Sequence, residues 1–301
     1  MIDISGENVV LVGALLLFVA VMAGKVAYRF GAPALLLFLG VGMLFGLDFI
    51  SYRSVDMTQF VGMIALCIIL FTGGMDTSFQ EIKPIIGPGV VLATVGVVMT
   101  AVVLAGFVWL IAPWIGLQIS FPLALLLAST MSSTDSASVF SILRSKKQGL
   151  KQHLRPLLEL ESGSNDPMAY MMTILLISIV TNTSGGVGMG MSIVYFVIQM
   201  IVGALSGYLI GRLAVWTINK INLANHSLYS VLLLAFIFFA FAFTDLVRGN
   251  GYLAVYLAGL VVGNHKLTQK RSLTVFFDGF TWLMQIVMFL TLGLFVNCDE
   301  L

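Results

Sequence analysis

Two acidic residues lie in apolar stretches of the sequence where a lipid bilayer would disfavour a charge. Asp135 belongs to Ser133-Thr134-Asp135-Ser136, and Asp166 belongs to Glu161-Ser162-Gly163-Ser164-Asn165-Asp166-Pro167. Neither stretch has a Lys or Arg among its central residues. A carboxylate at the bilayer centre costs about 2.5–3.5 kcal/mol on insertion scales, so such residues usually have a function. We expect the pair to hold a small cation or a proton.

The stretch around Asp135 is rich in side chains that weaken a helix. Ser, Thr or Asp occupies most positions from 129 to 138. Such side chains compete for backbone hydrogen bonds, and the freed carbonyls of an unwound segment can bind a cation inside a membrane protein. The alternative is a polar helix face sealed against a neighbouring helix. The acid in the middle of the stretch favours the functional interpretation.

The stretch around Asp166 places oxygen-bearing groups on two adjacent helix faces. Ser162 and Asp166 are four residues apart and share one face, while Glu161 and Asn165 share the next. Pro167 frees a carbonyl one turn back. Hard alkali cations prefer oxygen ligands, and the nearby cysteines and histidines are too few for a transition metal. For Asp166 alone, a neutral structural acid is the competing interpretation.

Two carboxylates in one dry cavity cannot both stay ionised without a counter-charge, so a proton and a cation compete for them. Competition at one site that opens alternately to each side is sufficient for exchange. The sequence contains no Gly-x-x-x-x-Gly-Lys-Ser/Thr run that would bind a nucleotide phosphate.

The composition predicts an all-α polytopic membrane protein surrounded by a lipid bilayer. The chain is 59% hydrophobic and 10% charged, with a mean hydropathy of +1.04, whereas soluble domains are about 25% charged. The net charge of +1 gives no reason to expect a nucleic-acid partner. Two cysteines far apart in the sequence predict neither a disulfide framework nor a metal site.

The apolar runs predict about ten membrane-spanning helices. They lie near 9–28, 32–49, 59–75, 86–112, 121–144, 156–180, 190–218, 227–246, 251–264 and 273–296. The second and ninth are short, rich in glycine and seven spans apart, so the two would lie in opposite orientations. Inverted repeats of this kind are typical of secondary transporters. The second repeat would be incomplete.

The basic residues predict the orientation of the chain in the membrane. All 15 except Arg53 and Arg248 follow odd-numbered predicted spans. Because Lys and Arg are enriched in cytoplasmic loops, we expect a multi-pass protein of the inner cell membrane with its N-terminus outside.

Several motifs give the chain a resemblance to a known family. Thr134-Asp135 and Glu161-Ser162-Gly163-Ser164-Asn165-Asp166 resemble the Thr-Asp and Glu-Ser-x-x-Asn-Asp signatures of monovalent cation/proton antiporters. Gly73-Gly74-Met75 and the runs 251–259 and 289–294 also match. The resemblance covers the whole chain. It is strongest to the electroneutral NhaP/NHE-like branch, and within it to bacterial potassium/proton antiporters of the NhaP type.

The resemblance implies a homodimer of thirteen-helix protomers that exchanges cytoplasmic K⁺, or Na⁺, for H⁺ one for one. It implies an alkali cation held by Asp135, Asp166, Ser162 and the carbonyl of Thr134. Glu161 would lie beside that site, and Asn165 would help to hold it together. The transported ions would be the protein's ligands, with no cofactor and no enzymatic activity. Because the sequence ends at Leu301 after about ten spans, we expect a C-terminally truncated chain, all of which (1–301) is the exchanger-type transmembrane domain.

Two other classes remain open from the residues. Two buried aspartates could be the catalytic pair of an intramembrane aspartyl protease, although that reading requires a Gly-x-Gly-Asp element, which the sequence lacks. The His-Glu-x-x-His run of a metalloprotease is also missing. A channel or anion carrier would favour intramembrane Lys or Arg and fewer acids.

Overall fold

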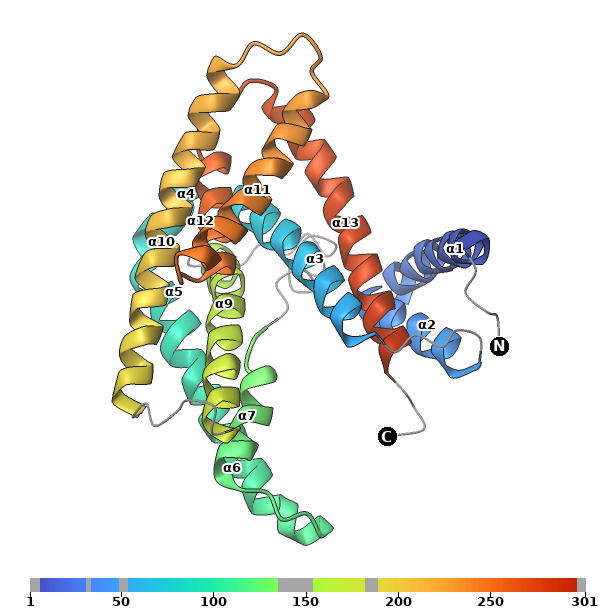
Figure 1. Cartoon of the computed structure of the whole chain (residues 1–301), viewed down its shortest axis with the longest axis vertical. Helices are drawn as coiled ribbons and strands as arrows, with labels where there is room; N and C mark the ends of the chain where they lie inside the picture. The colour runs from blue at the N-terminus through green and yellow to red at the C-terminus, as the bar shows by residue number, and fades with distance from the viewer. Residues whose placement is uncertain (1–5, 31–33, 49–53, 135–153, 182–188, 297–301) are drawn as a thin grey trace. The chain divides into compact units, whose positions relative to one another are not determined.

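The computed structural model describes residues 6–30, 34–48, 54–134, 154–181 and 189–296, and the regular structure in these ranges is entirely helical (Figure 1). Five helical segments in them are long and apolar enough to cross a bilayer. They are Val55–Asp76, Phe79–Ile115, Val194–Lys220, Leu228–Leu246 and Lys270–Phe295. The prediction of a multi-pass helical membrane protein is therefore confirmed. That the shorter apolar helices also cross the membrane, and that the whole fold has thirteen helices, stay predictions.

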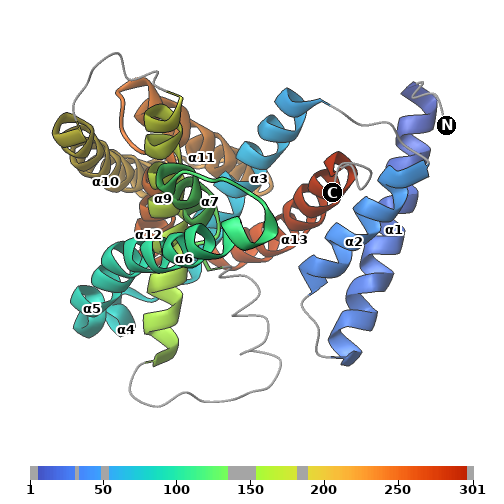
Figure 2. The same cartoon turned by 90° about the horizontal axis from the view of Figure 1, so that it is seen from below.

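The chain divides into two compact units. The first contains α1 (Gly6–Phe30), α2 (Ala34–Asp48), α3 (Val55–Asp76) as far as Thr72, and α13 (Lys270–Phe295). α1 lies along α2 (Figure 2). The core of this unit is formed by apolar side chains of α1, α2 and α13, namely Leu16, Ala20, Leu35, Phe38, Ile286 and Leu290.

Two glycines let α2 and α13 cross with their backbones in contact. A methyl group added at Gly42 would lie 2.9 Å from the Cα atom of Gly293 and would also meet the carbonyl oxygen of Leu290. Small residues at helix crossings permit such close approach, which replaces the hydrophobic effect as the source of packing energy in lipid. Elsewhere in this unit, Thr281 of α13 donates to Thr72 of α3 at 2.8 Å between the hydroxyl oxygens.

The second unit begins with one continuous apolar helical segment. It consists of α4 (Phe79–Ile82), η1 (Lys83–Ile85), α5 (Ile86–Val91), a π-helical turn η2 (Leu92–Gly96), α6 (Val97–Ile111) and η3 (Ala112–Ile115). The predicted span began only at residue 86, whereas the helical segment begins at Phe79. Pro84 lies in the first turn of η1, a position that proline's fixed φ suits.

The other helices of this unit are α7 (Phe121–Thr130), α9 (Leu154–Val180), α10 (Met189–Lys220), α11 (Leu228–Leu246) and α12 (Gly251–Gly263). α6 and α7 pack through buried alanines, Ala101 and Ala105 against Ala124 and Ala128. A hydrogen bond of 3.0 Å between the Ser129 and Thr173 hydroxyls then joins α7 to α9.

α12 is the most enclosed helix of the second unit, with nearly every side chain buried. Gly203, Gly207 and Gly211 form a stripe on α10 at intervals of four residues, and α12 lies directly on it (Figure 1). A methyl group at Gly203 would lie 2.7 Å from the carbonyl oxygen of Asn250, and one at Gly207 would lie 2.7 Å from the Cα atom of Ala254. Glycine is required at these positions because the neighbouring atoms belong to the backbone.

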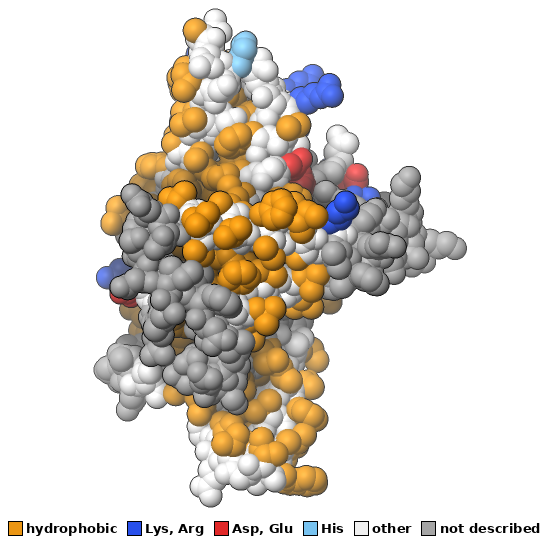
Figure 3. Space-filling view, turned by 90° about the vertical axis from the view of Figure 1, so that its right-hand side faces the viewer, with side chains coloured by type: hydrophobic (Ala, Val, Ile, Leu, Met, Phe, Trp, Pro, Cys, Tyr) orange, Lys and Arg blue, Asp and Glu red, His pale blue; other side chains and the backbone are white. Residues whose placement is uncertain are grey.

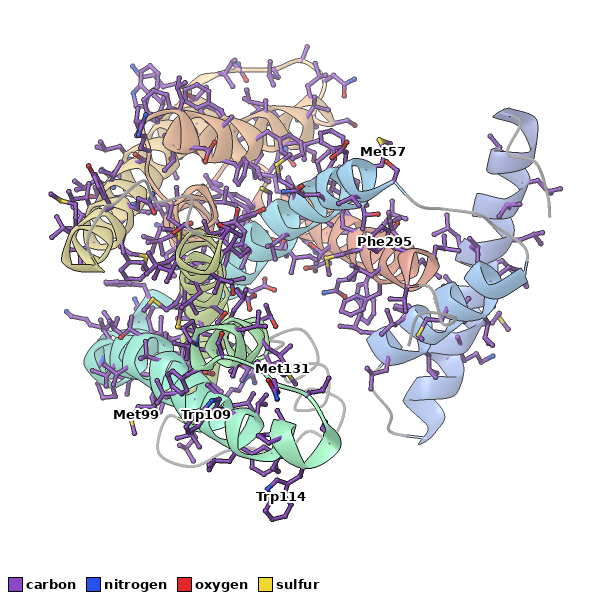
Figure 4. All side chains as sticks on the ribbon, turned by 60° about the horizontal axis from the view of Figure 1, so that its bottom comes forward. Met57, Met99, Trp109, Trp114, Met131 and Phe295 are labelled. Atoms are coloured by element: carbon purple, nitrogen blue, oxygen red, sulfur yellow. The ribbon has the colours of Figure 1, made fainter. Side chains whose placement is uncertain are left out.

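Apolar side chains (orange) are spread widely over the described part of the face seen in Figure 3. In the second unit, Met99, Trp109 and Trp114 point away from the ribbon of the η2–α6–η3 segment (Figure 4) and are 61%, 47% and 89% exposed. A contiguous exposed apolar surface of this extent marks a surface that another apolar phase covers. Together with the lengths of the helices, such a surface belongs to a segment covered by lipid or by other apolar helices.

Candidate functional site

The first part of the site is the unwound segment that follows α7. α7 ends at Thr130, and residues 131–134 continue without regular helix (Met131 is labelled in Figure 4). Three hydroxyls near this end donate to carbonyls three residues back, each at 2.7 Å: Ser129 to Leu126, Thr130 to Leu127 and Ser132 to Ser129. The predicted loosening of the helix before Asp135 is thus confirmed for residues 131–134. Asp135 itself lies outside the described residues.

The second part is the middle of α9, which remains helical through Pro167. Ser162 and Asn165 are buried, at 1% and 0% exposed, and Glu161 and Asp166 are half-buried. Burying amide, hydroxyl and carboxylate groups together in a membrane protein is favourable only when they satisfy one another's hydrogen bonds.

Asn165 lies at the centre of a hydrogen-bond network between the two parts. Its Nδ2 donates to the Thr134 hydroxyl at 2.6 Å and to Oε1 of Glu161 at 3.0 Å. The Thr134 and Ser162 hydroxyls are 2.9 Å apart, and both lie within hydrogen-bonding distance of Glu161 Oε2, at 3.4 Å and 3.3 Å. Four of the six predicted site residues therefore contact one another.

Asp166 joins the network through Ser133, which the sequence analysis did not single out. The Ser133 hydroxyl donates to Oδ1 of Asp166 and lies 3.2 Å from Oδ1 of Asn165. In the sequence, Ser133 is one of many hydroxyl residues between 129 and 138. Its place among the hydroxyl residues that precede the Thr-Asp pair was the one signal available, and that signal does not distinguish it from Ser132.

A cavity of about 530 Å³ opens beside the network. Its polar end is formed by Ser132, Ser133, Thr134 and Glu161, and its apolar wall includes Leu92 and Val97 of the η2–α6 segment together with Leu154, Leu157 and Leu158 of α9. The π-helical turn therefore contributes to this wall.

Two residues of the α11–α12 region hold α9 in place, and neither was predicted to do so. The ring of Tyr256 lies against Gly163, since a methyl group at Gly163 would be 2.6 Å from Cε2 of the ring. The Asn250 side chain, which is 3% exposed, donates from Nδ2 to the Pro167 carbonyl at 3.3 Å. These contacts fix α9 on both sides of Asp166.

The network offers side-chain oxygens from Ser133, Thr134, Glu161, Ser162 and Asp166 within one small region. Such a donor set suits a hard cation, because carboxylate and hydroxyl oxygens replace its hydration shell. Among the described residues no group of three or more His, Cys, Asp or Glu side chains could hold a metal ion. The oxygens here are instead mostly neutral hydroxyls around two carboxylates.

Comparison with known proteins gives three results. The model of the family described as "Sodium/hydrogen exchanger, transmembrane" matches residues 14–301. The chain is 40% identical over 296 residues to the K(+)/H(+) antiporter NhaP of Alkalimonas amylolytica and 35% identical over 294 residues to the K(+)/H(+) antiporter NhaP2 of a Shewanella species. Each match covers 97% of this chain and 50% of the relative, so the chain spans about half the length of these curated relatives.

The third result concerns the fold. The structure of the sodium proton antiporter MjNhaP1 from Methanocaldococcus jannaschii superposes with a TM-score of 0.75 at 19% sequence identity. The match covers 98% of this chain and 74% of that one. The chain therefore has the fold of that antiporter over nearly its whole length.

Proposed function

Because the chain belongs to the transmembrane sodium/hydrogen exchanger family, we propose that the intact protein is a secondary antiporter that exchanges a monovalent cation for protons. The observation that carries the proposal is the buried network around Asp166 and Glu161 in a membrane protein. Two carboxylates and three hydroxyls meet there beside a cavity. A site of this kind can hold either a desolvated cation or a proton, and that is what antiport requires.

In the proposed mechanism, the Asp166 carboxylate binds the cation together with Asp135, Ser162 and the main-chain carbonyl of Thr134. Protonation of the acids releases the cation, and binding of a cation releases the proton. Glu161 lies beside this site. Asn165 holds Thr134 and Glu161 in place through its two donated hydrogen bonds. Binding at a single site prevents both ions from crossing together.

The cation that we propose first is K⁺, with Na⁺ as the alternative. Relatives that are 35–40% identical are named K(+)/H(+) antiporters, whereas a relative from Synechocystis that is 24% identical is named a low-affinity Na(+)/H(+) antiporter. The relatives give no support to an intramembrane protease or to a channel.

We also infer that the protein works as a homodimer in the inner cell membrane, exchanges one cation for one proton, and has its N-terminus outside. The orientation is supported by the side on which nearly all its basic residues lie. One-for-one exchange is supported by the neutral Asn165 beside Asp166, which leaves a single ionisable group in that pair.

Everted membrane vesicles with a pH-sensitive dye test the proposal. Adding K⁺ to energised vesicles that contain the intact protein should release the proton gradient, and the Asp166→Asn or Asp135→Asn variant should abolish this response. Asp56→Asn, which changes an exposed acid in the first turn of α3, should behave like wild type. Undiminished exchange by the Asp166→Asn variant would falsify the proposal. Comparing K⁺ with Na⁺ identifies the ion, and an exchange rate unaffected by an imposed membrane potential supports one-for-one exchange.

A further inference from the structure

Ser133 has different hydrogen-bond partners from the other hydroxyl residues of its segment. Ser129, Thr130 and Ser132 all donate to backbone carbonyls three residues earlier, which is how a hydroxyl in a membrane helix is usually satisfied. The Ser133 hydroxyl instead reaches across to α9, where both of its acceptors, on Asn165 and Asp166, are side-chain oxygens. Such a position is not needed to end α7, because α7 already ends at Thr130.

The neighbours of this hydroxyl leave it two alternative orientations. A serine hydroxyl has one proton to donate and two lone pairs that can accept a hydrogen bond or bind a cation. The amide of Asn165 uses its Nδ2 on Thr134 and Glu161, so it is the Asn165 oxygen that faces Ser133. The single Ser133 proton can therefore point either at Asp166 or at Asn165.

We propose that Ser133 is a further cation-binding residue whose hydroxyl rotates between Asp166 and Asn165 as the occupancy of the site changes. When the Asp166 carboxylate is ionised and holds no cation, Ser133 donates to it, as in the structure. When a cation binds, the Ser133 proton turns to Asn165 Oδ1 and the hydroxyl oxygen becomes a neutral ligand beside Asp166. When Asp166 is protonated, the same orientation lets Ser133 accept its proton in a hydrogen bond.

This role rests on the proposed exchange function and adds a specific ligand to it. The hydroxyl donates to the ionised carboxylate of the half-buried Asp166, accepts from the protonated carboxyl group, and binds the cation beside it. Losing that partner is costly in a dry site, where water does not replace it. A cation that enters would gain one more oxygen without any additional charge.

The test compares Ser133→Ala with Ser133→Thr in the vesicle assay. Ser133→Ala should raise the cation concentration for half-maximal exchange about tenfold, while the maximal rate stays within about twofold. Ser133→Thr keeps a hydroxyl at the same atom and should restore the half-saturating concentration to near the wild-type value. Thr130→Val is the matched control, because the exposed Thr130 hydroxyl donates to the Leu127 carbonyl and lies outside the cavity lining, and it should change neither quantity.

The outcomes separate this inference from the proposed function. A wild-type protein that exchanges no cation for protons contradicts the function itself. A wild-type protein that does exchange, with an unchanged half-saturating concentration in Ser133→Ala, overturns only the role of Ser133. An equal loss in Ser133→Thr and Ser133→Ala overturns it too. Should Ser133→Ala fail to fold, as judged by size-exclusion chromatography, Ser133→Cys takes its place, because a thiol has similar size but is a weak donor and a poor ligand for alkali cations.

Discussion

Asn250 donates from its side-chain Nδ2 to the carbonyl oxygen of Pro167, 3.3 Å away, in the residue that follows Asp166. The Oδ1 atom of the same side chain accepts from the Leu253 amide at 3.1 Å and so caps the N-terminus of α12. The backbone N–H of Asn250 donates to the backbone carbonyl of Gln199 in α10 at 3.0 Å. One buried residue therefore connects three helices at the level of the candidate site.

Replacing Asn250 separates these roles. Asn250→Ala removes both the cap and the bond to Pro167, and we expect it to lower the free energy of unfolding by about 2–3 kcal/mol. Asn250→Ser keeps a capping oxygen but no amide donor, so it should lose less than half of that amount. Thermal unfolding of the purified protein in detergent measures both. Equal losses in the two variants would show that the cap contributes nothing.

We expect that Asp cannot replace Asn165, although the two side chains have the same shape. Asn165→Asp loses the two donated hydrogen bonds and places a second acid 3.0 Å from Glu161 Oε1. The like charges should lower both stability and exchange, and adding Glu161→Gln should recover part of the stability because the new amide can donate in the reverse direction. A double-mutant cycle should give a coupling energy of about 1–3 kcal/mol. Additive effects of the two changes would contradict this account.

Two glycines of α2 form a matched pair for testing the crossing with α13. A methyl group at Gly42 would meet the backbone at Gly293 and Leu290, whereas one at Gly40 would have no atom within 4 Å. Gly42→Ala should therefore cost about 1–3 kcal/mol through overpacking. Gly40→Ala should be neutral or stabilising, because alanine favours a helix by about 1 kcal/mol over glycine. Thermal unfolding decides between them, and similar losses at both positions would exclude the crossing as the cause.

Helix positions were largely predictable because long apolar runs and Gly-Asn boundaries are strong local signals. The run predicted at 251–264 is α12 (Gly251–Gly263), and the run at 227–246 is α11 (Leu228–Leu246). The helical segment that begins at Phe79 starts seven residues before the predicted span at 86. A charged residue followed by proline is typical of a loop, but Pro84 is also compatible with the first turn of a helix, and the surrounding apolar residues decide in favour of the helix.

From residue spacing alone, the site was predictable only where its members share one helix, and Thr134 was predicted through the family resemblance. Glu161 and Asn165 were placed on one face by their spacing of four, and their side chains do form a hydrogen bond. The contributions of Ser133 and Asn250 depend on how α7 and α12 pack on α9, and a single sequence holds no signal of that packing. The role of Asp135 stays a prediction, because it lies outside the described residues.

The glycine stripe on α10 also seals one side of the second unit. At Gly203 and Gly207, backbone atoms of Asn250 and Ala254 lie too close for even a single methyl group, and at Gly211 a methyl group would lie 2.9 Å from Cβ of Val261. A chain of water molecules needs both space and polar partners. The contact between α10 and α12 at these glycines offers no space. In the proposed antiporter, ions at α9 would therefore have no path along the boundary between α10 and α12. Bulkier residues at the three positions would force α10 and α12 apart. The first effect would be a proton leak that is not coupled to cation movement.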